Sequence, residues 1–181
     1  MQIEGGTGNG FKAKVTENNM LTTLAVTESI ERHINQHDGK AFNMLIAVTP
    51  AATDDCFAYI KNGADEDLVI EGFALKLAAT ESIYFKLGDT GTAGGSPTTV
   101  TPANLNAGSG HVAEGTFYTD PDITGLSGGI EVDRYYNTSG TTSVQVNFEQ
   151  DLIIPKNQTC TIWAETGTVA LHMVIYFHYY A

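Results

Sequence analysis

Alternation of apolar and polar residues is the feature of this chain that most restricts its fold. In TSVQVNFEQDLI every second residue from Val144 to Phe148 is apolar, and polar residues stand between them. IYFKLGD shows the same pattern at Ile83, Phe85 and Leu87. Successive side chains of a β-strand point to opposite faces, so a period of two is typical of a strand with one face in a core.

The pattern recurs along the chain in segments that Gly, Asn, Asp, Ser and Pro residues separate. Further strand-like segments are DLVIEGFALKL, GHVAEGTFYT, GGIEVDRYYN, QTCTIWAET and GTVALHMVIYFHYY. Long amphipathic helices do not alternate with them, which disfavours a parallel nucleotide-binding sheet. We therefore predict an all-β fold, an antiparallel β-sandwich or jelly roll, with one domain over residues 11–181.

Residues 27–38 are the one candidate helix. Ser29 precedes Ile30 and Ile34 at helical spacing, and Asp38-Gly39 ends the segment. The same apolar residues, together with Val26, also fit a period of two, so the pattern allows either a short helix or a strand.

Two glycine-rich segments interrupt the strand pattern. Residues 1–10 include GGTGNG, which cannot pack a core, and we expect a flexible N-terminal arm there. Residues 88–110, GDTGTAGGSPTTVTPANLNAGSG, have a single charge at Asp89. We expect a long Gly/Thr/Pro-rich loop that lies against another surface, since loops of this length in compact domains are usually functional or disordered.

The first glycine-rich segment has the appearance of a phosphate loop but lacks its spacing. In GGTGNGFK, Phe11 stands where the phosphate-binding lysine belongs, and Lys12 follows one position late. Too few residues precede the segment to form the buried strand that such a loop follows. No nucleotide cofactor is expected.

Charge and cysteine usage exclude several classes of partner. Nine Lys plus Arg stand against twenty-one Asp plus Glu, and the net charge is −12. This charge argues against nucleic acid or an anionic membrane as partner. The opening MQIEGG has neither the basic nor the apolar region of a secretory signal. Cys56 and Cys160 each lie in a strand-like run outside any CxxC pair, so we expect buried free thiols rather than a disulfide.

Candidate catalytic and metal-binding patterns are incomplete. His33 and His37 are spaced to share one helical face, but HINQH lacks the inner glutamate of zinc proteases and offers no third ligand. Asp120 and Asp122 in YTDPD match only a fragment of a calcium loop, and a surface turn is the simpler interpretation. No G-x-S-x-G motif is present. We expect no enzyme activity, no cofactor and no metal.

The end of the chain is the most informative anomaly. No Asp, Glu, Lys or Arg follows Glu165, and the odd positions of the closing strand are all apolar or aromatic. The even positions carry His and Tyr, which bury large areas at interfaces while keeping a polar tip. This even face, with His172, Tyr176, His178 and Tyr180, is expected to be covered either by the chain itself or by a second subunit.

The order of these segments resembles virion structural proteins of tailed bacteriophages. The segments that carry the resemblance are FKAKVTENNMLTTLAVTESIERHINQHDGKAFNM at the start, TPANLNAGSG, AEGTFY, GGIEV, LIIPKNQTCTIW and the aromatic last strand. The resemblance spans most of the chain, and its motifs are structural. It implies a β-sandwich that works by packing on a capsid or tail, often as a trimer, without shared catalytic residues.

Three functions follow as expectations. The first is a non-enzymatic capsid decoration protein that bridges major-capsid subunits, made in the bacterial cytoplasm and located in the virion. The second is a tail or head-fibre component that binds a host surface glycan, with aromatic residues beside acids in FYTDPD or DRYYN. The third, least favoured, is an enzyme. The expected contact residues are Gly8, Phe11, Thr101, Asn104, Asn106, His172, Tyr176, His178 and Tyr180.

Overall fold

The computed structural model describes residues 14–15, 21–22, 29–137 and 143–180. Its strands are β1 Lys14–Val15, β2 Leu21–Thr22, β3 Ala41–Val48, β4 Asp55–Asn62, β5 Asp67–Leu77, β6 Glu81–Leu87, β7 Thr90–Gly94, β8 Thr98–Thr99, β9 Ala103–Asn104, β10 Gly115–Thr119, β11 Thr124–Ser127, β12 Ile130–Asn137, β13 Val144–Ile154, β14 Thr159–Ala164 and β15 Leu171–Tyr180. A short α-helix, α1 (Ile30–His33), continues directly into a π-helix, η1 (Ile34–Asp38).

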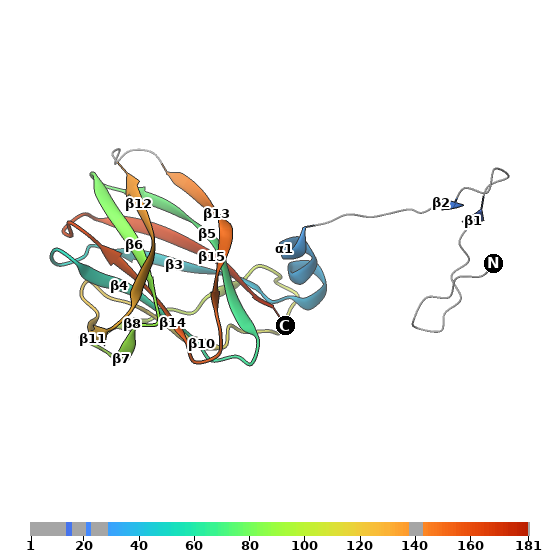
Figure 1. The fold of residues 1–181 in the computed structure, drawn as a ribbon, viewed down its shortest axis with the longest axis horizontal. Helices are drawn as coiled ribbons and strands as arrows, with labels where there is room; N and C mark the ends of the chain where they lie inside the picture. The colour runs from blue at the N-terminus through green and yellow to red at the C-terminus, as the bar shows by residue number, and fades with distance from the viewer. Residues whose placement is uncertain (1–13, 16–20, 23–28, 138–142, 181) are drawn as a thin grey trace.

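Two antiparallel sheets face each other as a sandwich (Figure 1). One sheet has the order β13-β5-β15-β3-β9 and the other β12-β6-β14-β4-β10-β8. The chain crosses between the sheets at β3 to β4, β4 to β5 and β5 to β6, and again at each connection from β12 to β15. This interleaved order is that of a jelly roll, so the predicted all-β sandwich is confirmed.

The core lies between the inner faces of the two sheets. Its largest fully buried side chains include five phenylalanines, which are Phe42, Phe57, Phe73, Phe85 and Phe177. The rings of Phe73 on β5 and Phe85 on β6 lie 5.3 Å apart between centroids, so they join the two sheets. Phe117 on β10 also joins the two sheets, because its ring stacks against that of Phe177 on β15 at 5.5 Å between centroids. The period-two pattern in the sequence corresponds to this buried layer.

The region predicted as helix or strand is helical over its described part. The Ser29 hydroxyl accepts a hydrogen bond from the Arg32 N–H at 3.3 Å, as an N-terminal cap does. Gly39 ends η1 with a φ of 63°, and its N–H donates to the Ile34 carbonyl at 2.7 Å. Ile34 is buried, and η1 contacts β15. The helix therefore covers part of the outer face of the five-stranded sheet.

The segment 88–110 is not the continuous loop that its composition predicts, because β7, β8 and β9 lie within it. It belongs to a longer insertion between β6 and β12. In this insertion β9 pairs with β3, β10 pairs with β4, and β8 pairs with β10. The insertion thus covers the neighbouring edges of both sheets, so the surface against which it lies belongs to the chain itself.

The two-stranded sheet of β7 and β11 packs on the outer face of the six-stranded sheet. Ile123 is buried with Cys56 and Tyr59 in a second, smaller apolar cluster there. Asp89, buried at the start of the insertion, accepts hydrogen bonds from the Gly129 N–H at 2.9 Å and the Thr161 hydroxyl at 2.5 Å. A single carboxylate therefore holds the two ends of the insertion together.

Candidate functional site

The closing strand β15 runs through the middle of the five-stranded sheet, between β5 and β3. Its odd-numbered side chains from Leu171 to Tyr179 are buried in the core, as the sequence predicts. The even-numbered side chains lie on the outer face and differ in exposure. His172 and Tyr180 are exposed, Tyr176 is half-buried and His178 is buried. The even face is therefore not one uniform surface.

His178 is already covered within its own chain, so its burial does not require a second subunit. Its Nδ1 lies 2.5 Å from the Glu71 Oε1 of β5, and only 4% of the residue is exposed. An acidic substitution at His178 would place two carboxylates side by side inside the monomer. Such a variant would test monomer stability, so His178 is a poor probe of a subunit contact.

The opposite end of the same face is hollowed and almost free of charge. We call the surface of Leu45, Ala47, Ala74, His172 and Val174 the hollow; its volume is about 320 Å³. The alanines of β3 and β5 flank the larger residues of β15 and leave space above the sheet. Leu45 is 60% exposed at its rim. Lys76 is the one formally charged residue among the described residues that line it.

Asn104 and Asn106 are engaged within the chain. The Asn104 amide donates to the carbonyls of Gly39 at 2.8 Å and His111 at 3.0 Å. The Asn106 amide donates to the Asn35 carbonyl at 2.9 Å. Both side chains therefore hold the insertion against η1, an internal role that the sequence did not reveal. Thr101 is exposed beside them. Gly8 and Phe11 lie outside the described residues.

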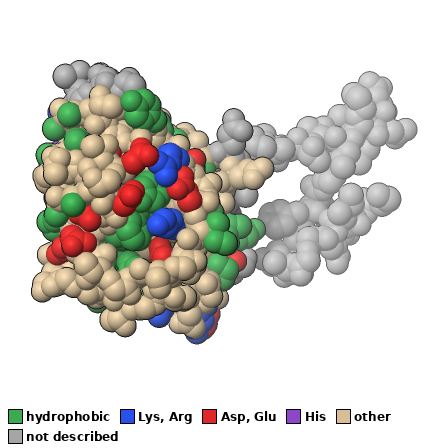
Figure 2. Space-filling view, turned by 60° about the vertical axis from the view of Figure 1, so that its left-hand side comes forward, with side chains coloured by type: hydrophobic (Ala, Val, Ile, Leu, Met, Phe, Trp, Pro, Cys, Tyr) green, Lys and Arg blue, Asp and Glu red, His purple; other side chains and the backbone are tan. Residues whose placement is uncertain are grey.

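The outer face of the six-stranded sheet carries a second group of residues, which sequence reasoning missed. We call Tyr84, Lys86, Arg134 and Trp163 the aromatic–cation cluster. The Lys86 Nζ lies 4.0 Å from the Trp163 ring centroid, and the Arg134 guanidinium lies 4.6 Å from that of Tyr84. Figure 2, which brings the left-hand side of Figure 1 forward, shows basic and acidic side chains gathered around apolar ones.

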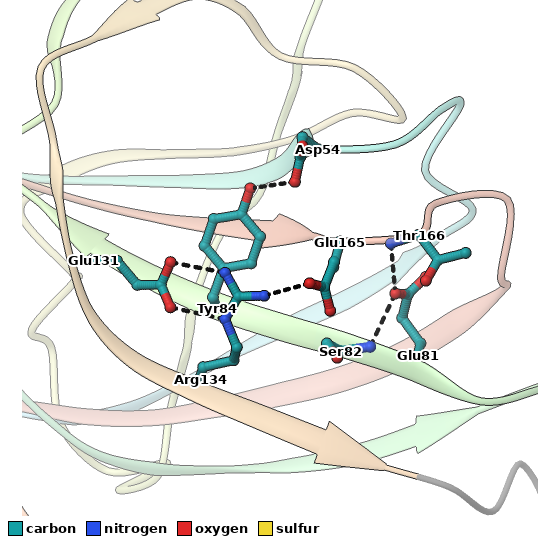
Figure 3. Close-up of polar contacts among 8 residues, drawn as sticks. All are labelled: Asp54, Glu81, Ser82, Tyr84, Glu131, Arg134, Glu165 and Thr166. Carbon is teal, nitrogen blue, oxygen red and sulfur yellow. Dashed lines mark hydrogen bonds and ion pairs between the residues drawn. The ribbon is translucent and has the colours of Figure 1, made fainter.

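Acidic residues hold this cluster in place (Figure 3). Arg134 donates to both carboxylate oxygens of Glu131 at 2.8 Å and to Glu165 at 2.6 Å. The Tyr84 hydroxyl donates to Asp54 at 3.0 Å. Because carboxylates already engage the guanidinium and the cations already lie against the rings, the cluster joins β12, β6 and β14 rather than presenting an open aromatic shelf.

The pKa shifts in this cluster have simple causes. The hydrogen bonds from Arg134 lower the pKa of Glu131. The Ser82 hydroxyl, and after it Arg134, lowers the pKa of Glu165. Burial, followed by the hydrogen bond to Asp54, raises the pKa of Tyr84. The lowered pKa values keep Glu131 and Glu165 ionised beside Arg134, and the raised pKa keeps the Tyr84 hydroxyl protonated beside Asp54. None of these shifts produces a general acid or base near neutral pH.

The aromatic residues expected to stack on sugars are only partly available. Tyr118 of FYTDPD stacks on Tyr59, and Tyr135 of DRYYN packs edge-on against Phe73 in the core. Tyr136 is the exposed member, at 63%. Which of these rings faces water depends on the residues against which each ring packs, and a single sequence does not specify those neighbours.

Neither candidate metal-binding pattern assembles a ligand set among the described residues. The rings of His33 and His37 lie 4.6 Å apart between centroids. The Asp120 carboxylate accepts the Asp122 N–H at 3.0 Å, which closes a surface turn. Within the described ranges, no group of three or more His, Cys, Asp and Glu is placed to hold a metal ion.

Cys56 and Cys160 are buried free thiols, as predicted. Burial raises the pKa of the Cys56 thiol to about 12 and raises that of Cys160 in the same direction. Neither thiol is therefore available as a nucleophile.

The described part of the chain contains no helix that is long and apolar enough to span a membrane. In comparisons with known proteins, no family model, curated protein or solved structure matches the chain.

Proposed function

We propose that this protein is a non-enzymatic virion structural protein, a capsid decoration protein that bridges neighbouring major-capsid subunits. It acts as a homo-oligomer, with a trimer favoured, and has neither nucleic acid nor membrane as partner. The proposal is supported by the resemblance of its segments to tailed-phage virion proteins. It is also supported by the jelly-roll topology, which capsid proteins and lectins use.

The hollow is the observation that carries the proposal. A sheet face in water normally presents charged side chains, whereas this one presents Leu45, Val174 and two alanines with a single lysine at the side. Apolar surface depleted in charge is the composition of an interface centre. In a symmetric oligomer on a shell, each contact that forms raises the effective concentration for the next one, so that weak contacts combine into a stable attachment.

The electrostatics favour a protein partner. A net charge of −12 repels the phosphate backbone of nucleic acid and anionic lipids alike. The hollow itself lacks acidic residues among its described lining, so the repulsion between acidic copies is smallest there. We infer that copies meet each other through the hollow and meet the capsid through other surfaces, including the insertion and residues 1–10.

Counting the protein in purified particles tests this proposal. Quantitative mass spectrometry against the major capsid protein, with immunogold labelling, should give several hundred copies distributed over the shell. A few copies at one vertex or on the tail would contradict decoration and favour the second candidate, a fibre or tail component that binds a host glycan. Absence from particles would contradict both virion roles.

The glycan-binding candidate is favoured by one observation. A pocket between η1 and the five-stranded sheet is lined by Tyr176 and by the polar residues Arg32, Asn35 and Glu71. It does not include the hollow, so a glycan site and a subunit contact are compatible on one molecule.

A further inference from the structure

Strand β3 has an open edge over its second half. On one side β3 pairs with β15 along its whole length, and on the other side it pairs with β9 at Phe42 and Asn43 only. Beyond these two residues, no strand in the described part of the chain adjoins β3 on that side. Leu45 and Ala47 are both exposed there. An exposed strand edge is a template on which a further strand can pair.

The backbone groups of Leu45 and Ala47 point out of this edge. The Ala41 carbonyl accepts the Leu105 N–H at 2.9 Å from the side of β9, whereas the Lys40 carbonyl accepts an N–H of β15 at 3.1 Å. Successive backbone groups of a strand alternate in direction, so the even-numbered residues of β3 bond to β15 and the odd-numbered residues point the other way. Leu45 and Ala47 therefore each present one N–H and one C=O to a strand that the described part of the chain does not supply.

The open edge lies between two concave surfaces of different polarity. On the outer face is the hollow, which is apolar and includes Leu45 and Ala47. Toward the six-stranded sheet is a second surface of about 570 Å³, which Ala47 also lines and to which Thr98, Thr119 and Asp120 add polar groups and one acid. A strand that pairs with β3 fits both surfaces if one of its faces is apolar and the other is polar or basic.

The chain contains a two-stranded sheet with this pattern. Among the described strands, β1 and β2 pair only with each other, with Lys14 opposite Thr22. A two-stranded sheet is marginally stable by itself and is stabilised by a third strand or by packing. The sequence around β1, FKAKVT, alternates apolar residues with Lys12 and Lys14, and it has no acid in a chain of net charge −12.

We propose that β1 of one copy pairs with the open edge of β3 in a neighbouring copy. The single chain leaves an edge unpaired on both strands, and the open edge adjoins the hollow, so the same neighbour supplies both contacts. The apolar residues of FKAKVT continue the hollow, and its lysines face Asp120. This inference rests on the proposed homo-oligomer and specifies how its copies are joined. A contact between unlike surfaces closes into a ring, as a trimer requires.

Hydrogen exchange of single backbone N–H groups, measured by NMR on the full chain, tests the pairing. The N–H groups of Leu45 and Ala47 should exchange at least about tenfold more slowly than in a variant without residues 1–22, because each is released only when β1 leaves. The Ile46 N–H, which points toward β15, is the matched control and should be protected equally in both proteins. The deletion removes no residue of the core, so circular dichroism should be unchanged.

Cross-linking identifies the copy that supplies β1. A tagged Val15→Cys variant and an untagged Ala47→Cys variant, co-expressed and treated with a short bismaleimide, should give a cross-linked pair of chains. The native cysteines are buried and do not compete. Tyr136→Cys in place of Ala47→Cys is the control and should give no such pair, because Tyr136 is exposed on the other sheet.

Protection of Leu45 and Ala47 together with a cross-link between chains supports the proposal. Equal exchange of these two groups in the full chain and the deletion variant would overturn it. If light scattering still shows an oligomer in that case, the copies associate without β1 and the proposed homo-oligomer stands. A cross-link that forms only within a chain carrying both cysteines would also overturn the proposal, since β1 would then pair with β3 of its own chain.

Discussion

At the scale of single residues, Glu81 shows how a buried charge stabilises this fold. Its carboxylate is 1% exposed and accepts the backbone N–H groups of Ser82, Thr166 and Gly167 at 2.8–2.9 Å. These bonds hold the turn before β15 against the start of β6 (Figure 3). The carboxylate is satisfied by backbone donors alone among its described contacts, so its role is structural.

Glu81→Gln should therefore destabilise the protein. The substitution replaces one acceptor by an NH2 group that meets a backbone donor, and we expect a loss of roughly 2–3 kcal/mol in the free energy of unfolding. Urea denaturation measures this loss. Glu165→Gln is the control, because Glu165 makes a surface ion pair with Arg134 and should lose less than about 1 kcal/mol. Equal losses in the two variants would contradict the assigned role of Glu81.

The two thiols give the stability a pH dependence on the alkaline side. Burial raises the pKa of Cys56 from 9.0 to about 12, so the unfolded chain releases the proton first as pH rises. Stability should therefore be unaffected by Cys56 below pH 9.0 and should fall between pH 9.0 and about 12. Melting temperatures across this range check the prediction, with Cys56→Ala as the variant whose alkaline decline is shallower. Rapid labelling of native thiols near neutral pH would contradict it.

At the scale of elements, the two-stranded sheet of β7 and β11 depends on close backbone approach. Gly91 has a φ of +104°, and a Cβ there would lie 2.1 Å from the Gly125 carbonyl oxygen. Gly91→Ala should lower the free energy of unfolding by roughly 1–3 kcal/mol, the usual cost of such backbone strain. Gly110→Ala is the matched control, since no atom lies within 4 Å of its Cβ position. Hydrogen exchange of the Ile123 N–H should increase in the Gly91→Ala variant only, and unchanged exchange there would contradict the packing of this two-stranded sheet.

The strands and the helix could be predicted from the sequence where a local pattern, such as alternation or capping, determines them. The alternation in β13 correctly placed Val146 and Phe148 toward the core, and the capping pattern at Ser29 and Gly39 agrees with the helix found. The insertion was not predictable, because short strands such as β8 and β9 depend on the edges they join rather than on local pattern. For the same reason, the burial of His178 required knowledge that Glu71 lies beside it.

At the scale of the whole molecule, the outer surfaces of the two sheets differ in what covers them. The insertion covers the neighbouring edges of both sheets, the aromatic–cation cluster joins three strands on the outer face of the six-stranded sheet, and η1 covers part of the other outer face. The hollow lies on that same outer face, at the opposite end of β15 from η1. Its lack of charge supports the central claim that copies of this chain meet there.

Multi-angle light scattering after size exclusion tests that claim most directly. The wild type should have the mass of a homo-oligomer, with a trimer favoured. Leu45→Glu and Val174→Glu should be monomers with unchanged circular dichroism, because an unpaired carboxylate buried in an interface costs several kcal/mol. Tyr136→Glu, at an exposed site of the other sheet, should keep the wild-type mass. A monomeric wild type, or an oligomer that persists in both hollow variants, would contradict the claim.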